Sequence, residues 1–124
     1  MADHDGPAAA PMLKSEADLD HLLAAAPRQP VMIFKHSTTC PISAAAFREF
    51  QAALAGGDLA GARPAVVRVI EERPLSRSIA RRWSVTHQSP QALLVQGPNV
   101  LWHASHHAIT REALGAAVKA AAPA

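Results

Sequence analysis

The chain of 124 residues contains a single cysteine, few aromatic residues and no long apolar run. One cysteine excludes a scaffold held together by internal disulfides, and it fits a reducing compartment. No apolar stretch approaches the ~18 residues that a membrane-spanning helix needs. The first residues, MADHDGPAAAPM, are acidic and lack the basic and apolar regions of a secretory signal. We therefore expect a cytoplasmic protein with no membrane partner.

The charge is small overall but uneven along the chain. A formal net charge of +2 does not by itself indicate a nucleic-acid partner, and we expect none. Residues 63–83, however, hold six arginines and two glutamates. The spacing of Arg73, Arg77 and Arg81 places them on one face of a helix. This stripe is either a solvated helix face or a dock for the carboxylates of a small acidic thiol, which arginine binds through paired hydrogen bonds.

The composition predicts a disordered tail over residues 1–13 and a single domain over residues 14–121. Ser15 and Asp18 have the spacing of a capping box. The apolar residues that follow recur at helical spacing, which predicts a first helix over 16–26.

The remaining elements alternate between strands and helices. The apolar run over 31–36 is continuous, which is typical of a strand covered on both faces. The pattern then predicts a helix over 41–54, a strand over 65–70, a helix from Pro74, a hairpin of strands 91–95 and 100–104, and a last helix capped by Thr110. The order, a helix followed by βαβαββα, predicts an α/β fold in which a four-stranded mixed sheet carries helices on both faces.

Cys40 stands where the strand over 31–36 gives way, through a polar turn, to Pro41 and a helix. Proline is tolerated at the first helical position, where its missing N–H would be unpaired. The free N–H groups of a helix start stabilise an anion, so we expect them to bond the sulfur as a thiolate, its nucleophilic form. A small buried hydrophobe is the alternative for a free cysteine, but the polar surroundings favour a reactive thiol. With no second cysteine in the chain, its disulfide partner must come from another molecule.

Polar residues on either side of the thiol are candidates for tuning it or for ordering its turn: Lys35, His36, Thr38, Thr39 and Ser43. Ser43, one turn into the helix, can offer a hydroxyl hydrogen bond to the sulfur. Lys35 and His36 can add positive potential, but alternation along a strand sends them to opposite faces, so we expect at most one to face the sulfur. We expect the two threonines to order the turn through side-chain-to-backbone bonds.

The order of elements, with a cysteine at the first strand-to-helix turn and a proline before the third strand, resembles the thioredoxin fold. Residues 40–43 match the two-cysteine motif of that fold, with serine in place of the second cysteine, as in its monothiol members. The string over 35–43, KHSTTCPIS, resembles more specifically a small family of monothiol, bacilliredoxin-like proteins associated with the bacillithiol system. Residues 87–91 and the pair Trp102-His103 also resemble that family, and the likeness covers about residues 15–120.

The resemblance implies a thiol–disulfide oxidoreductase that uses Cys40 to reduce mixed disulfides between proteins and a low-molecular-weight thiol. It implies bacillithiol as that cosubstrate and no bound cofactor, although the residues themselves do not distinguish bacillithiol from glutathione. It also implies that Pro90 follows a cis bond and faces the cysteine, and that the Ser89 backbone pairs with an extended substrate. His87 would border the site. We expect a monomer.

Two other functions stay open. Monothiol glutaredoxins can share an iron–sulfur cluster between two chains through their cysteines, and a thioredoxin-like adaptor would have no catalysis at all. Glutathione binding of the glutaredoxin type is in doubt, because the glycine pair and the Thr/Ser-Asp of those proteins are replaced here by residues 104–110, ASHHAIT. We expect no metal site at His103, His106 and His107, which have no cysteine or carboxylate beside them.

Overall fold

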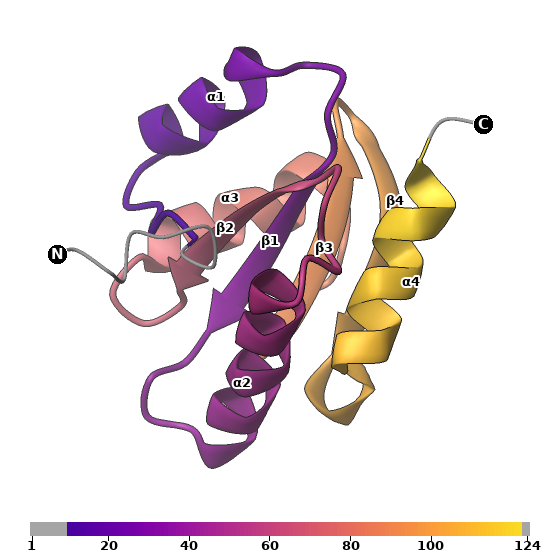
Figure 1. Ribbon diagram of the computed structural model, residues 1–124. Helices are drawn as coiled ribbons and strands as arrows, with labels where there is room; N and C mark the ends of the chain where they lie inside the picture. The colour runs from indigo at the N-terminus through magenta and orange to yellow at the C-terminus, as the bar shows by residue number, and fades with distance from the viewer. Residues whose placement is uncertain (1–9, 123–124) are drawn as a thin grey trace, which may run out of the picture.

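Strands and helices alternate along the chain, and the strands form one sheet between two helical layers (Figure 1). The structure is a computed structural model and describes residues 10–122. Its elements, in chain order, are α1 (Glu16–Ala25), β1 (Val31–His36), α2 (Pro41–Ala55), β2 (Arg63–Arg68), α3 (Arg73–Trp83), β3 (Gln91–Gln96), β4 (Asn99–Ser105), the short 3-10 helix η2 (His106–Ala108) and α4 (Arg111–Ala121).

The sheet has the strand order β2-β1-β3-β4. β1 pairs parallel with β2 and antiparallel with β3, and β3 pairs antiparallel with β4. β1 is therefore a central strand, and its first five residues are buried, as the continuous apolar run predicts. The thioredoxin-like α/β fold with a four-stranded mixed sheet is confirmed.

The two faces of the sheet bury separate apolar cores. One core joins the sheet to α2 and α4 through Met32, Phe34, Phe50, Leu94 and Leu114. The other joins it to α1 and α3 through Leu19, Val31, Ile33, Ile79 and Leu93. Because side chains alternate along β1, Lys35 continues the face toward α3 and His36 continues the face toward α2. This alternation places the polar residues of the site.

The first helix begins as predicted, but the folded part of the chain begins before residue 14. Ser15 Oγ accepts a hydrogen bond from the Asp18 N–H at 3.1 Å. Upstream, the Leu13 N–H donates to the Val66 carbonyl at 2.8 Å, and the Val66 N–H donates to the Pro11 carbonyl at 2.9 Å. Residues 11–13 of the predicted tail therefore lie along β2, and residues 1–9 lie outside the described part of the chain.

The second strand is displaced by two residues from the predicted range of 65–70. It begins at Arg63 because Arg63 and Pro64 pair with the first residues of β1. The chain leaves the sheet after Arg68, and the side chain of Ile70 is 49% exposed. Apolarity alone does not separate the end of this strand from the loop that follows it.

No helix within residues 10–122 is both long and apolar enough to cross a membrane.

Candidate thiol site

Cys40 is the N-cap residue of α2, and Pro41 is the first helical residue. Its backbone is extended, its carbonyl accepts the Ala44 N–H at 3.0 Å, and its own N–H donates to the Ser37 carbonyl at 3.3 Å. The thiol is partly exposed. It therefore stands at the positive end of a 15-residue helix, open to a reaction partner.

The sulfur lacks the amide bonds that we expected from the helix start. The side chain of this N-cap residue makes no capping hydrogen bond. The favourable potential at Cys40 comes instead from the aligned peptide dipoles of α2.

Ser43 does not bond the sulfur either, which corrects the prediction for its hydroxyl. Its side chain is fully buried, and its Oγ accepts the Ser37 N–H at 2.9 Å. The same Oγ lies 2.7 Å from His36 Nδ1. All three groups are satisfied when the Ser43 hydroxyl donates to Nδ1, which assigns the proton of a neutral His36 to Nε2. The residue in the second-cysteine position thus fixes the turn rather than the thiol.

His36 lies on the α2 side of the sheet, as alternation requires. Its ring stacks on Phe47, with centroids 4.5 Å apart and planes inclined by 15°. Burial lowers the pKa of His36, and the nearby Glu71 charge opposes that shift. The ring is therefore a neutral link between the end of β1 and the first turn of α2.

Lys35 lies on the opposite side of the sheet, facing α3. Its side chain is fully buried, and its Nζ is 3.1 Å from His87 Nδ1. Desolvation lowers the pKa of Lys35 to about 8. The prediction that the two strand residues point to opposite faces is confirmed, and neither hydrogen bond involves Cys40.

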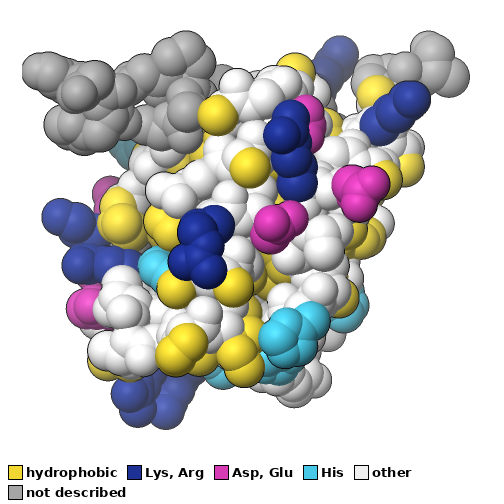
Figure 2. Space-filling view, turned by 60° about the horizontal axis from the view of Figure 1, so that its bottom comes forward, with side chains coloured by type: hydrophobic (Ala, Val, Ile, Leu, Met, Phe, Trp, Pro, Cys, Tyr) yellow, Lys and Arg dark blue, Asp and Glu magenta, His cyan; other side chains and the backbone are white. Residues whose placement is uncertain are grey.

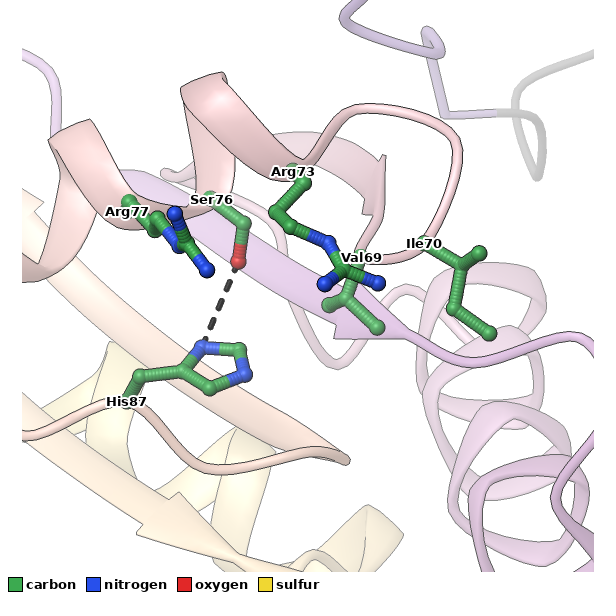
Figure 3. A pocket seen from close by; sticks show the side chains of 6 residues that line it. All are labelled: Val69, Ile70, Arg73, Ser76, Arg77 and His87. Atoms are coloured by element: carbon green, nitrogen blue, oxygen red, sulfur yellow. Dashed lines mark hydrogen bonds between the residues drawn. The ribbon is translucent and has the colours of Figure 1, made fainter.

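His87 is held by two polar side chains, Lys35 and Ser76, and Ser76 was not among the residues predicted for the site. Besides Lys35, Ser76 Oγ lies 3.3 Å from its Nδ1 (Figure 3). Partial burial is the largest cause that lowers the pKa of His87, and the charges of Lys35 and Arg77 lower it further. Ser76 is buried at a position three residues before Ile79 on the apolar face of α3. A polar residue in an apolar stripe was the available signal for it.

The two threonines of the turn are exposed. Thr39 Oγ1 lies 3.4 Å from Ser37 Oγ. Within residues 10–122 neither threonine makes the side-chain-to-backbone bond that we expected. The turn is closed by the Cys40 N–H on the Ser37 carbonyl.

The Ser89-Pro90 peptide bond is cis, as the resemblance implied. Pro90 immediately precedes β3, whose first residue, Gln91, is the register partner of Lys35 on β1. Pro90 and the loop that carries Cys40 therefore lie at the same end of the sheet. The Pro90 carbonyl accepts the His106 N–H at 3.1 Å, which ties this segment to the end of β4.

Figure 2 brings this end of the molecule forward. Lys and Arg side chains are spread over this face, from its left and lower edge to its centre and upper right, and most of the visible histidine surface lies at its lower right. Within residues 10–122, no group of three His, Cys, Asp or Glu side chains is placed to hold a metal ion.

Solved structures with this architecture include several redox proteins. A structure described as an oxidoreductase with a thioredoxin fold is 32% identical, with a TM-score of 0.77, covering 87% of this chain and 92% of its own. A thioredoxin from Fasciola hepatica is 14% identical, with a TM-score of 0.72, and the match covers 90% of this chain and 99% of that one. A thioredoxin from Trypanosoma brucei brucei is 8% identical, with a TM-score of 0.73, and the match covers 97% of this chain and 96% of that one. Both share the fold. Fold and sequence similarity together define a thioredoxin-fold thiol oxidoreductase, here with a single cysteine.

The family can be named more closely. Residues 11–114 match the family described as monothiol bacilliredoxin BrxC. This chain belongs to that family.

Proposed function

We propose that this chain reduces mixed disulfides between proteins and a low-molecular-weight thiol, and that bacillithiol is that thiol. The observation that carries the proposal is a partly exposed Cys40 at the N-cap of α2, in a chain with no other cysteine. A lone thiol so placed can accept a small thiol but cannot expel it through an internal disulfide.

The first step is attack by the Cys40 thiolate on the small-thiol sulfur of the mixed disulfide. The bond between that sulfur and the client sulfur breaks, and a bond to Cys40 forms. The client cysteine leaves as a thiolate and takes a proton from solvent. The client is reduced, and the small thiol is now held on Cys40.

A second molecule of small thiol completes the cycle. Its thiolate attacks the small-thiol sulfur held on Cys40, which releases an oxidised small-thiol dimer and regenerates the Cys40 thiolate. The two electrons that reduced the client therefore come from two small thiols. This cycle requires a reducing compartment, such as the cytoplasm, and no bound cofactor. A monomer can perform it.

The rest of the site supports a fixed cysteine with an open approach. Ser43 and His36 hold the turn from inside the fold, and Lys35 with His87 adds positive charge beside it. The segment of Ser89 and Pro90 lies at the same end of the sheet, where we propose that its backbone meets an extended client segment.

Intact-mass analysis after incubation with oxidised bacillithiol, and separately with oxidised glutathione, tests the identity of the thiol. We expect one bacillithiol adduct on the wild-type chain, formed faster than the glutathione adduct, and none on Cys40→Ser. Faster glutathione addition would contradict the choice of bacillithiol. Freshly purified protein with Cys40-dependent visible absorption bands would instead indicate an iron–sulfur carrier.

A further inference from the structure

A cavity of about 300 Å³ opens beside the end of β1, on the side of the sheet that faces α3. Its lining comes from the loop after β2, from α3 and from the segment that precedes the cis proline: Val69, Ile70, Arg73, Ser76, Arg77 and His87. Two of these lining residues are apolar, and the other four carry hydrogen-bonding groups. None of the residues already assigned to the cysteine's own turn lines it.

Positive charge is concentrated around this cavity. In Figure 3 the side chains of Arg73 and Arg77 reach from α3 on either side of Ser76, with His87 opposite them. Lys35, which does not line the cavity, bonds His87 Nδ1 through its Nζ at 3.1 Å. Because Nδ1 accepts from the Lys35 ammonium, the neutral His87 ring carries its proton on Nε2.

No described ion pair neutralises the two cavity arginines. Within residues 10–122, neither Arg73 nor Arg77 takes part in an ion pair, whereas Arg68 pairs with Glu72, and Arg82 pairs with Glu16 and Asp20. Lys35 is a buried cation whose hydrogen-bond partner, His87, is neutral. Two guanidinium groups and an ammonium without a described carboxylate create a potential that favours an anion.

The cavity adjoins the segment of β1 that leads into the turn of Cys40. The Val69 N–H, at the cavity wall, donates to the His36 carbonyl at 2.9 Å. Ser37 follows His36, and its carbonyl accepts the Cys40 N–H at 3.3 Å. Along this hydrogen-bonded path, only His36 and Ser37 stand between Val69 at the cavity wall and Cys40.

We propose that this cavity binds a carboxylate of the small thiol that Cys40 exchanges, with Arg73 and Arg77 as its specificity-determining residues. The inference rests on the proposed function and extends it, because it names the group of the cosubstrate that is recognised, a carboxylate, and the residues that recognise it. Guanidinium groups bind carboxylates through two parallel hydrogen bonds, and Ser76 and His87 add neutral hydrogen-bonding groups at the cavity floor. Of the three arginines at four-residue spacing, Arg81 does not line the cavity.

Two disulfides of similar size test this site without any client protein. Dithiodipropionate carries a carboxylate at each end, and hydroxyethyl disulfide is neutral. The rate at which each modifies Cys40 is followed by intact mass, and the ratio of the two rates is compared among variants. Arg77→Gln and the double variant Arg73→Gln/Arg77→Gln remove cavity charges. Arg81→Gln removes one charge from the same helix outside the cavity and is the matched control.

We expect the preference for the anionic disulfide to fall by about tenfold in the double variant, the factor of one lost charge-assisted hydrogen bond. It should fall by less in Arg77→Gln and stay near the wild-type value in Arg81→Gln. The rate with the neutral disulfide should be the same in all four proteins. An unchanged preference in the double variant would overturn the subsite, as would an equal loss in Arg77→Gln and Arg81→Gln, which would indicate unspecific attraction.

A binding measurement separates this inference from the exchange chemistry. Dithiodipropionate is titrated into Cys40→Ser, which cannot react, and into Cys40→Ser carrying the two arginine substitutions. Binding that disappears with the arginines supports the subsite even if the wild-type cysteine proves unreactive, whereas equal binding by both proteins contradicts it. Failure of both disulfides to modify wild-type Cys40 would overturn the proposed function alone.

Discussion

The Ser43 hydroxyl bonds His36 Nδ1 at 2.7 Å, although it occupies the position of the second cysteine in the two-cysteine motif of the fold. It also accepts the Ser37 N–H. His36 is the last residue of β1, and Ser37 begins the turn that leads from β1 to Cys40. Replacing the second cysteine by serine therefore removes a resolving thiol and adds a buried clamp on the turn that carries the first one.

Ser43→Ala should destabilise the fold more than it impairs exchange. The substitution leaves the buried Ser37 N–H and the half-buried His36 Nδ1 without this partner, which costs about 1–3 kcal/mol. The sulfur loses no hydrogen bond, so its rate with a neutral disulfide should stay within about twofold of wild type. Denaturant unfolding and the exchange rate measure the two effects. A large loss of rate at unchanged stability would show that the hydroxyl acts on the sulfur after all.

Lys35 should make the fold more stable as the pH rises above 8. Burial lowers its pKa from 10.5 to about 8, so between these values the unfolded chain holds a proton that the folded chain has released. The free energy of unfolding then increases with pH across this interval, by up to about 3 kcal/mol. Below a pH of about 8 Lys35 is charged in both the folded and the unfolded chain, so the folded state bears the full cost of burying that charge.

Lys35→Met isolates this contribution, because the other titrating groups are common to both proteins. We expect the stability of wild type to rise relative to Lys35→Met between about pH 8 and pH 10.5. Parallel stability curves for the two proteins would mean that the lysine is neutral at the lower pH or is charged throughout.

His36 should make the fold sensitive to mild acid. Its pKa is lowered in the folded chain by burial, so below the ordinary value of 6.5 the unfolded state takes up the proton first and stability falls. Protonation would also remove Nδ1 as the acceptor for Ser43. Unfolding of wild type and His36→Gln at about pH 7.5 and about pH 5.5 measures this. Wild type should lose more stability; an equal loss would assign the acid sensitivity elsewhere, with His87 the next group to test.

Much of the fold could be predicted because its strongest signals are local. The continuous burial of β1, the Ser15 cap and the hairpin of β3 and β4 each follow from a few adjacent residues. The ends of β2 could not be predicted, since strand pairing with β1, rather than apolarity, decides where the strand begins.

The candidate site divides in the same way. Alternation along β1 correctly separated Lys35 from His36, but the partners of these residues come from distant segments. The bond from Lys35 to His87 joins residues 52 positions apart. Ser43 was expected on the sulfur because it lies one turn into the helix that follows Cys40. The Ser43 hydroxyl instead bonds the buried Ser37 N–H and the His36 ring, and it makes no bond to the sulfur.

The most direct test of the account is a single turnover with a defined mixed disulfide. A client protein with one cysteine, carrying bacillithiol on it, is mixed with one equivalent of this chain, and both masses are measured after quenching with acid. We expect the client to appear as a free thiol while the chain gains one bacillithiol on Cys40, and added bacillithiol should then remove that adduct. A lasting disulfide between client and chain, or a client that keeps its bacillithiol, would contradict one-thiol exchange through Cys40.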